Sequence, residues 1–168
     1  MQNEKVTEKE TLAGEWKELL DLLEKHNAAL EERARNLSSK FWSSKLKQGN
    51  GDPSKGGCLG CRIRSRESSG AIYAEWYKTI WVKKQGAEKA KPLGQYVKKG
   101  KRDQFGYNME SLKRIAKPVE VDEVLETEKA FRLIRELNHC LIQLRKYAAQ
   151  TIEVEKKWEA LSEGVDGE

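Results

Sequence analysis

The sequence predicts an α+β fold: two long antiparallel amphipathic helices, N- and C-terminal, plus a central three-stranded antiparallel β-sheet with one short helix. Three observations lead to this class. Apolar residues repeat at heptad spacing in both outer thirds of the 168 residues, the centre alternates as strands do, and glycine and proline separate the patterns. One structural domain is expected, made of a helix over 1–47, a glycine-rich linker over 48–60, a basic sheet region over 61–117, a helix over 118–162 and a disordered acidic tail over 163–168.

The N-terminal helix is predicted from a single apolar stripe. Thr7 and Glu10 fit a capping box that would begin the helix, and the glycines and proline of QGNGDPSKGG would end it at Lys45 or Lys47. His26 is expected to be a polar residue that sets the register. The stripe repeats every four and three residues, and it consists of Leu12, Trp16, Leu19, Leu23, His26, Leu30 and Leu37.

The C-terminal helix carries a similar stripe. Pro118 should end the preceding segment, and Asp122 should cap the new helix. The stripe consists of Ala130, Ile134, Leu137, Leu141, Leu144 and Ala148, and it is broadened by Phe131, Leu133, Cys140, Ile142 and Tyr147. So broad a stripe predicts two neighbours for this helix. The two long helices would pair antiparallel, either within one chain or in a dimeric four-helix bundle.

The centre reads as a β-hairpin followed by a third strand. Residues 61–66 and 71–83 are predicted strands, and a two-residue Ser69–Gly70 turn would pair Arg64 with Glu75. The same register pairs Arg66 with Tyr73, Arg62 with Tyr77, and Ile63 with Trp76. A third strand is expected over 93–99. Asn108 should then cap a short helix that holds Leu112 and Ile115, with Tyr107 and Leu112 as a hydrophobic staple.

Charge is concentrated in this central region. Residues 41–117 hold 18 Lys and Arg and 6 Asp and Glu, a net charge of +12, whereas residues 1–40 carry −2 and residues 118–168 carry −5. A basic centre between acidic flanks is typical of a surface that meets a polyanion. The pattern therefore favours nucleic-acid binding over any particular reaction.

One face of the predicted hairpin is polar, and it is the candidate DNA-binding face. Arginine forks can contact phosphates or guanine edges, a carboxylate can accept from cytosine, and aromatic rings can pack on sugars or thymine methyls. A small sheet also fits the major groove. The candidate residues are Arg62, Arg64, Arg66, Tyr73, Glu75, Tyr77 and Trp81, with Lys83, Lys84, Lys98, Lys99, Lys101 and Arg102 as phosphate contacts.

Three alternatives stay open. The polar face could be only the solvated side of a sheet, in which case the chain is a coiled-coil protein–protein adaptor with no specific DNA binding. Phe105 and Tyr107 could stack on unpaired bases. Cys58 and Cys61 have the spacing of half a zinc site, which Cys140 and a histidine would have to complete.

The sequence predicts no enzyme and no cofactor. It holds two histidines, His26 and His139, far apart in the chain, and it lacks a P-loop and a nucleophile elbow. A tyrosine nucleophile at Tyr73 or Tyr77 would have nothing to activate it. A cytoplasmic location is expected, because there is no secretory signal, no apolar run of membrane-spanning length and an odd number of cysteines.

Three stretches carry a family resemblance: CRIRSRESSGAIYAEWYKTIWVKK, QYVKKGKRDQFGYN and ETEKAFRLIRELNHCLIQL. Their layout resembles that of the MobI-type mobilization proteins of integrative conjugative elements and large conjugative plasmids, over roughly residues 61–144. The resemblance implies an auxiliary DNA-processing factor that acts at the origin of transfer beside a separate relaxase. It brings no catalytic residues, and the cysteine pair is not a feature associated with the family. The expected partners are double-stranded origin DNA, a relaxase or other transfer protein, and a second copy of the chain, with no membrane.

Overall fold

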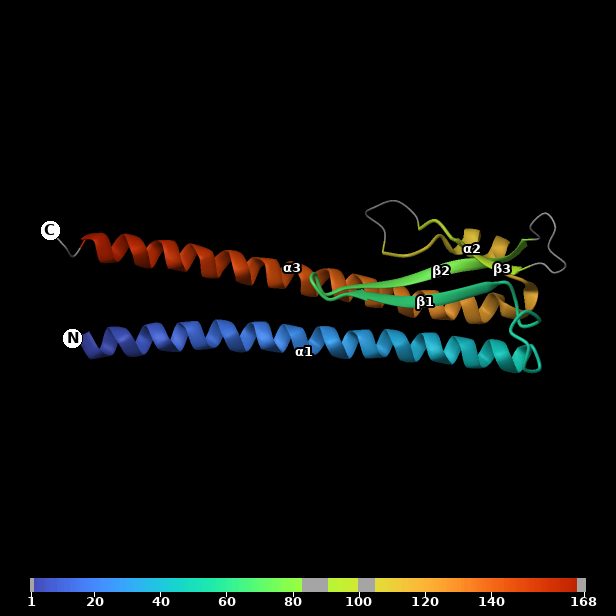
Figure 1. Cartoon of the computed structure of the whole chain (residues 1–168), viewed down its shortest axis with the longest axis horizontal. Coiled ribbons are helices and arrows are strands. Elements are labelled where there is room, and N and C mark those ends of the chain that lie inside the picture. Colours follow the sequence, from blue (N-terminus) through green and yellow to red (C-terminus); the bar gives the residue numbers. More distant parts are fainter. Residues whose placement is uncertain (1, 83–90, 100–104, 166–168) are drawn as a thin grey trace.

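Two long helices run antiparallel, and a three-stranded sheet lies along one end of them (Figure 1). The computed structural model describes residues 2–82, 91–99 and 105–165. The elements are α1 Gln2–Gln48, β1 Leu59–Arg66, β2 Ala71–Val82, β3 Lys91–Tyr96, α2 Met109–Ile115, a 3-10 turn Pro118–Glu120, and α3 Val121–Val165. The predicted α+β fold class is confirmed. α3 includes residues 163–165, which were expected in the acidic tail, and the remaining tail residues, 166–168, lie outside the described residues.

α1 packs on α3 through a heptad stripe that differs from the predicted one. Leu19 and His26 are exposed, and Leu20 and Asn27 take their places. The stripe runs through Trp16, Leu20, Leu23, Asn27, Leu30, Ala34, Leu37 and Phe41, all buried or half-buried. The side chain of Leu12 lies outside the described residues.

Both ends of α1 can be compared with the prediction. The helix begins at Gln2, so Thr7 lies inside it and is not its N-cap. It ends at Gln48, close to the predicted position. Asn50 has a φ of 51°, and the Gly51 amide donates to the Leu46 carbonyl at 2.8 Å, so a left-handed turn closes the helix as glycine-rich C-terminal caps do.

α3 has the two neighbours that its broad apolar stripe predicts. Ile134, Leu141 and Ala148 are buried or half-buried on the α1 side, whereas Leu137 and Leu144, which were expected in this seam, are exposed. Two hydrogen bonds fix the antiparallel alignment at its ends: Trp16 Nε1 donates to Glu155 at 2.6 Å, and Ser44 Oγ donates to Glu123 at 3.0 Å. Asp122 lies inside the helical run that starts at Pro118, so it is not the cap.

The strands form an antiparallel meander in the order β1-β2-β3. β1 and β2 pair as predicted, but the register differs by two residues: Arg62 lies opposite Glu75, and Arg64 lies opposite Tyr73. Arg66 therefore faces Ala71, Ile63 faces Ala74 and Cys61 faces Trp76. The cause is the turn, which spans residues 67–70 rather than two residues, with Gly70 at a φ of 64°. A shift of two preserves the face of every side chain, so the predicted polar face is confirmed.

Two asparagines hold the tip of this hairpin against both long helices. Asn138 Nδ2 donates to Asn27 Oδ1 at 2.8 Å and to the Gly70 carbonyl at 2.9 Å, and Asn138 Oδ1 accepts from the Ile72 amide at 3.0 Å. Asn27 Nδ2 also donates to the Gly70 carbonyl, at 3.1 Å. Because Asn138 is buried, each of these polar groups needs the partner it has.

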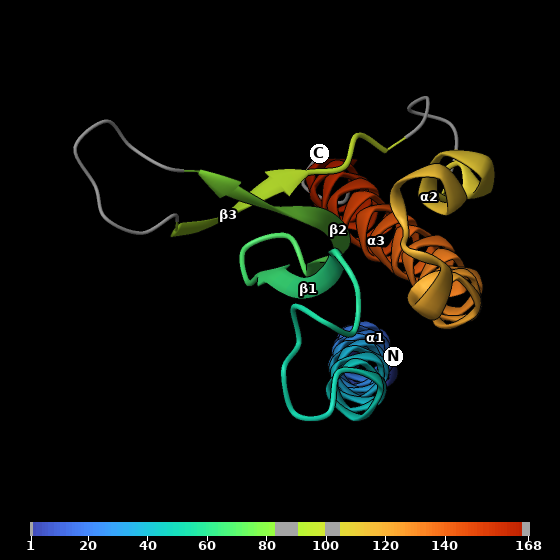
Figure 2. The same ribbon diagram turned by 90° about the vertical axis from the view of Figure 1, so that its right-hand side faces the viewer.

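β3 and α2 complete the sheet side. β3 spans Lys91–Tyr96, slightly earlier than predicted, and with the end of β2 it extends beyond the helices (Figure 2). Asn108 caps α2 as predicted, since its side chain accepts from the Ser111 amide at 2.9 Å. Tyr107 and Leu112, the predicted staple, are both buried in the core.

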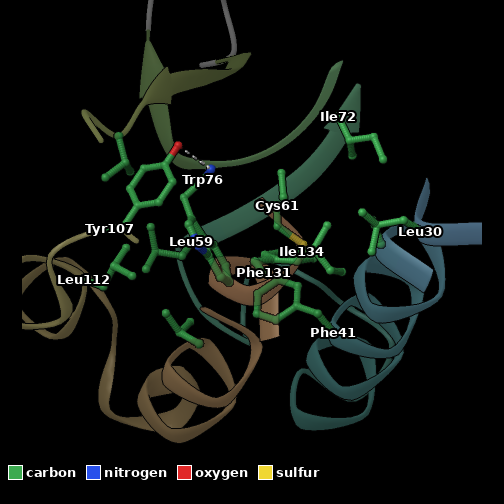
Figure 3. Packing of buried hydrophobic residues seen from close by; sticks show 14 residues of the cluster. Leu30, Phe41, Leu59, Cys61, Ile72, Trp76, Tyr107, Leu112, Phe131 and Ile134 are labelled. Atoms are coloured by element: carbon green, nitrogen blue, oxygen red, sulfur yellow. Dashed lines mark hydrogen bonds between the residues drawn. The ribbon is translucent and has the colours of Figure 1, made fainter. Parts of the chain in front are cut away.

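The core lies between the inner face of the sheet and the two helices (Figure 3). Trp76 of β2 is fully buried, and its ring meets Phe41 of α1 edge-on at 5.2 Å and Phe131 of α3 at 5.9 Å. Leu59 and Cys61 of β1 pack into the same cluster. One aromatic residue from each of three elements thus fixes the sheet to the helical pair.

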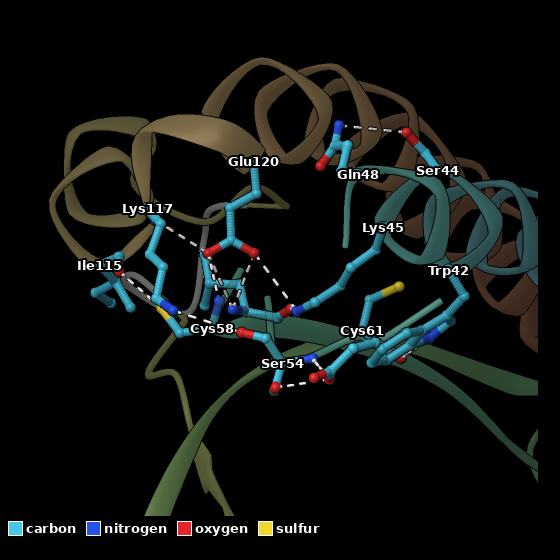
Figure 4. Close-up of polar contacts among 12 residues, drawn as sticks. Trp42, Ser44, Lys45, Gln48, Ser54, Cys58, Cys61, Ile115, Lys117 and Glu120 are labelled. Carbon is cyan, nitrogen blue, oxygen red and sulfur yellow. Dashed lines mark hydrogen bonds and ion pairs between the residues drawn. The ribbon is translucent and has the colours of Figure 1, made fainter. Parts of the chain in front are cut away.

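A buried ion pair joins the end of α1 to the start of α3 (Figure 4). Glu120 is 1% exposed, and it accepts hydrogen bonds from the amides of Cys58 (2.8 Å), Leu59 (3.2 Å) and Lys117 (3.0 Å). Lys45 Nζ lies 3.5 Å from the same carboxylate and also donates to the Leu59 carbonyl. Burial lowers the pKa of Lys45, and Glu120 opposes this shift. The junction sets where β1 begins.

Candidate nucleic-acid interface

The outer face of the sheet, which points away from α1 and α3, is the candidate site. On β1, Leu59 and Cys61 point into the core, so Arg62, Arg64 and Arg66 project together from the other side, and all three are exposed. The pairing places Glu75 and Tyr73 of β2 among them. The predicted gathering of three arginines on one side of a pleated ribbon is confirmed. Arg62 and Arg64 also form ion pairs with Glu75 within the sheet, however, as the solvated-face alternative expects.

Glu75 lies at the centre of this face and organises two of the arginines. Its carboxylate accepts from Arg62 Nε at 2.8 Å and from Arg64 Nε and Nη2 at 3.0 and 2.7 Å. The Tyr96 hydroxyl donates to it at 3.1 Å. Glu75 is only 5% exposed, so it is poorly placed to accept from a base, the role that the sequence predicted. Its geometry is that of a positioning residue.

The electrostatics follow from this geometry. Burial would raise the pKa of Glu75, but the hydrogen bonds from Arg64, Arg62 and Tyr96 outweigh it and hold the pKa below its ordinary value. The hydrogen bonds to Glu75 and the negative charge of Glu75 in turn raise the pKa of Arg64. The face thus combines three guanidinium groups with one ionised carboxylate, which leaves a net charge of about +2.

Aromatic rings hold the two paired arginines from the side. The Arg62 guanidinium lies 6.0 Å from the ring centroid of Tyr96, and that of Arg64 lies 5.9 Å from the ring of Tyr73. The side chains of Arg62 and Arg64 remain 49% and 58% exposed. Arg62 contacts Glu75 through Nε, so this contact leaves the donors of its two terminal nitrogens unused. Both forks are fixed and accessible.

A chain of buried polar groups supports this face from below. The Tyr107 hydroxyl lies 3.5 Å from the Tyr96 hydroxyl and accepts from the Trp76 amide at 3.4 Å. Beneath them, Glu128 accepts from Trp76 Nε1 and from the Tyr107 amide, both at 2.7 Å. Burial raises the pKa of the Tyr107 hydroxyl, so it stays protonated and can donate.

Glu128 and Arg135 form the buried base of that chain. Arg135 Nη2 and Nη1 lie 2.6 and 3.0 Å from the carboxylate, and Nη1 also donates to the Phe105 carbonyl at 2.6 Å. Both side chains are less than a tenth exposed. Burial raises the pKa of Glu128 and lowers that of Arg135, and each partner opposes the shift of the other.

The other predicted DNA contacts fall into three groups. Lys98 and Lys99 are exposed next to β3, although partial burial and the nearby Arg135 lower the pKa of Lys99. Tyr77 shares the outer face but is half-buried, because its ring covers Gly60 and Gly94 of the neighbouring strands. The side chain of Trp81 lies outside the described residues, as do Lys83, Lys84, Lys101 and Arg102.

A recess lies next to the arginines, along the stretch of β2 that has no β3 partner. It has a volume of about 280 Å³ and is lined by Tyr73, Glu75, Tyr96, Lys99, Phe105 and His139, among others. Phe105 is half-buried against His139, with ring centroids 5.3 Å apart, and Tyr107 is 4% exposed. Tyr107 is therefore not free to stack on an unpaired base, as the alternative interpretation required.

The three cysteines occupy separate environments. Cys61 is buried beside Ser38, with 3.4 Å between Sγ and Oγ, and burial raises its pKa to about 11. Cys58 donates to the Ile115 carbonyl at 3.1 Å, and burial raises its pKa as well. Cys140 is exposed on α3. Across the ranges that the structure describes, no three His, Cys, Asp or Glu residues cluster as metal ligands, so the geometry gives the zinc alternative no support.

Tyr96 is the residue of this face that the sequence pattern did not identify. It lies on the predicted third strand, and the observed pairing places it opposite Tyr77 and therefore on the outer face. Its signal was available in principle, because strand alternation assigns a face once the register is known. The register of β3 was not predicted, so the contact to Glu75 could not be.

Among the described helices, none combines the length and apolarity that a membrane span requires.

Comparison with known proteins gives one finding. The family model described as MobI protein matches residues 30–149, which include the C-terminal part of α1, the whole sheet, α2 and much of α3. No match was found among curated proteins or among solved structures.

Proposed function

The chain belongs to the MobI protein family, which indicates a role in mobilization, and from this premise we propose that it is a non-enzymatic accessory factor that binds duplex DNA at the origin of transfer. The outer face of the sheet would contact the DNA, and a separate relaxase would carry out the strand chemistry. The observation that carries the proposal is the group Arg62, Arg64 and Arg66, exposed together on one face.

The pairing with Glu75 supports preorganised recognition. A free arginine must lose side-chain freedom when it binds, and prior fixation reduces that cost. Glu75 holds Arg62 through Nε and Arg64 through Nε and Nη2, so the other guanidinium donors remain for phosphate oxygens or for guanine O6 and N7. The carboxylate lowers the net charge of the face, and in return it fixes the direction of both forks.

The shape of the sheet supports docking on a duplex. A two- or three-stranded ribbon has the width to enter a major groove, and the end formed by β2 and β3 extends beyond the helices (Figure 2). Lys98 lies exposed beyond β3 and would contact the phosphate backbone. The arginines would then read or straddle the groove while lysines add affinity that does not depend on sequence.

The test is a mobility-shift titration with the chain's own origin-of-transfer duplex and a scrambled duplex. Arg64→Ala should lose about 1–3 kcal/mol on the origin duplex and less on the scrambled one. Lys98→Ala should weaken both equally. Arg33→Ala, which removes an exposed arginine of α1, is the matched control and should leave both unchanged.

Two outcomes would count against the proposal. Equal losses on both duplexes for Arg64→Ala would remove the base-reading role. Absence of any shift at low salt, with the protein folded, would favour the protein–protein adaptor.

A further inference from the structure

α3 carries a second heptad stripe that faces neither α1 nor the sheet. It recurs at intervals of four and three residues over 29 residues, and every position in it is exposed. Leu133 is 60% exposed, Tyr147 63% and Trp158 73%. The outer stripe consists of Leu133, Leu137, Cys140, Leu144, Tyr147, Thr151, Val154, Trp158 and Leu161.

The outer stripe is distinct from the two sides of α3 that are already covered. Ile134, Leu141 and Ala148 face α1, and Phe131 and Asn138 are buried beneath the sheet. The hairpin tip at Gly70 reaches α3 near Arg145, and the helical pair continues past it (Figure 1). The stripe is exposed along its length, although near its C-terminal end Val154 and Trp158 border a cavity that Trp16 of α1 also lines.

The exposed apolar area of the outer stripe is large enough for a stable protein–protein interface. Its seven large apolar side chains expose on the order of 800 Å², about what each partner contributes to a stable interface of standard size. Scattered apolar residues on a surface need no explanation, but a contiguous patch above a few hundred Å² marks an interaction site. A strict heptad period also specifies the partner's form, because it matches another α-helix.

We propose that the occupant is a second copy of the chain, with α3 packed antiparallel on α3 of the partner subunit. An antiparallel coiled coil pairs the a positions of one helix with the d positions of the other. With Leu144 opposite Tyr147 of the partner subunit at the centre, the outward layers follow in order. They are Cys140 with Thr151, Leu137 with Val154, and Leu133 with Trp158, each repeated by symmetry.

The side-chain volumes favour this orientation. The largest residue, Trp158, meets a leucine rather than a second tryptophan, so the volumes of the layers vary less than they would in a parallel pair. A parallel pair would instead stack every residue on its own copy. Trp158 would then meet Trp158 of the partner subunit, and Cys140 would meet a second cysteine.

The flanking charges favour the same register. The residues beside the outer stripe, on the side away from α1, are Glu136, Gln143, Gln150 and Lys157. The antiparallel register brings Glu136 next to Lys157 of the partner subunit at both ends, and Gln143 next to Gln150 of the partner subunit between them. In a parallel pair, Glu136 and Lys157 lie 21 residues apart along the axis, about 30 Å, and cannot meet.

Sedimentation equilibrium of the full chain tests the dimer. The wild type should show twice the monomer mass of 19.3 kDa. Leu144→Glu places charges in the two central layers and should raise the dissociation constant on the order of a thousandfold. Ala149→Glu is the matched control, since Ala149 is exposed on α3 but outside the stripe, and it should remain dimeric. Circular dichroism of both variants checks that α3 is intact.

Disulfide trapping tests the orientation. Under oxidising conditions, the Thr151→Cys variant should form a covalent dimer, because the new thiol at position 151 lies next to Cys140 of the partner subunit and can form a disulfide with it. The further substitution Cys140→Ser should abolish this dimer. The wild type should not crosslink through Cys140, because the two copies of that residue lie about 16 Å apart along the axis. Glu136→Lys should weaken the dimer, and Glu136→Lys combined with Lys157→Glu should restore it.

Three results that differ from these expectations would each overturn part of the proposal. A chain that stays at 19.3 kDa at every concentration would mean that a different protein covers the outer stripe. A wild-type disulfide through Cys140 would mean a parallel pair. Equal dissociation of Leu144→Glu and Ala149→Glu would place the dimer contact elsewhere.

Discussion

Glu128 belongs to the buried network that supports the arginine face from below. Its replacement by alanine should lower the free energy of unfolding more than any substitution of a surface residue. Glu128 is 1% exposed and satisfies three buried donors: the Arg135 guanidinium, Trp76 Nε1 and the Tyr107 amide. The Glu128→Ala variant leaves all three without that acceptor. An unpaired buried charge is the costliest of these losses, because the low-dielectric interior cannot solvate it.

The magnitude follows from these contacts. Breaking a buried ion pair by removing one partner costs about 3–5 kcal/mol. Among the described residues, the Arg135 guanidinium would then keep the carbonyls of Ala74 and Phe105 as hydrogen-bond partners. We therefore expect the free energy of unfolding to fall by about 4 kcal/mol, which lowers the midpoint of thermal unfolding by about 10 °C in a chain of this size. Urea titration followed by circular dichroism measures the loss.

The matched control removes the orphaned charge as well. Glu128→Ala combined with Arg135→Met replaces the guanidinium by an apolar side chain of similar length, so the double variant should be more stable than Glu128→Ala alone. A coupling of about 1–3 kcal/mol is expected between residues in one network. Strict additivity, or a loss below about 1 kcal/mol for Glu128→Ala, would refute the reasoning that this pair is buried and mutually dependent.

Three further predictions concern the sheet. Because the pKa of Glu75 is lowered in the folded protein, this group stabilises the fold above the ordinary pKa of a glutamate, and the stabilisation is lost as the pH falls through the folded pKa. The urea midpoint of Glu75→Gln should thus depend less on pH than that of the wild type between about pH 5 and 3. Urea midpoints that fall equally with pH in both proteins would contradict this. Asn138→Ala leaves the Ile72 amide unpaired and should cost about 1–3 kcal/mol in the same titration, whereas an unchanged midpoint would show that the hairpin tip is held by other contacts. Gly60→Ala places a Cβ 2.6 Å from the Tyr77 ring and should cost about 1–3 kcal/mol, and wild-type stability would mean that the ring moves freely.

The sequence was sufficient for the classes of element and for the faces of the hairpin. Alternation put Arg62, Arg64 and Arg66 on one side and Trp76 on the other, and burial of one face makes that assignment robust. The predicted register of β1 and β2 was wrong by two residues, because the length of the turn between them depends on how the tip of the hairpin binds the helices. Asn27 and Asn138 hold Gly70 from both helices, and that contact is long-range.

The helical seams show a second limit. A heptad pattern selects apolar residues, so Leu19 and His26 were chosen for α1 although Leu20 and Asn27 face α3. Asn27 is a seam residue because Asn138 and the hairpin tip provide its partners. On α3, two apolar stripes overlap in sequence, and periodicity alone could not decide which of them faces α1. Only the packed structure separates the inner seam from the exposed one.

The organisation of the arginine face was predicted only in part. Glu75 was expected opposite Arg64 and in contact with a base, but it lies opposite Arg62, also contacts Arg64, and is covered by the Tyr96 hydroxyl. Its burial arises from these three neighbours together. Pairwise alternation cannot show such a cluster, because its members come from three strands.

Fluorescence anisotropy of labelled duplex DNA over a series of salt concentrations probes the central claim most directly. Compared with the wild type, a variant in which Arg62, Arg64 and Arg66 are all glutamine should bind more weakly. Its plot of log affinity against log salt should also be shallower, by about 0.9 for each of these arginines that contacts a phosphate and not a base. An unchanged slope and affinity in the folded triple variant would contradict the assignment of this face to DNA.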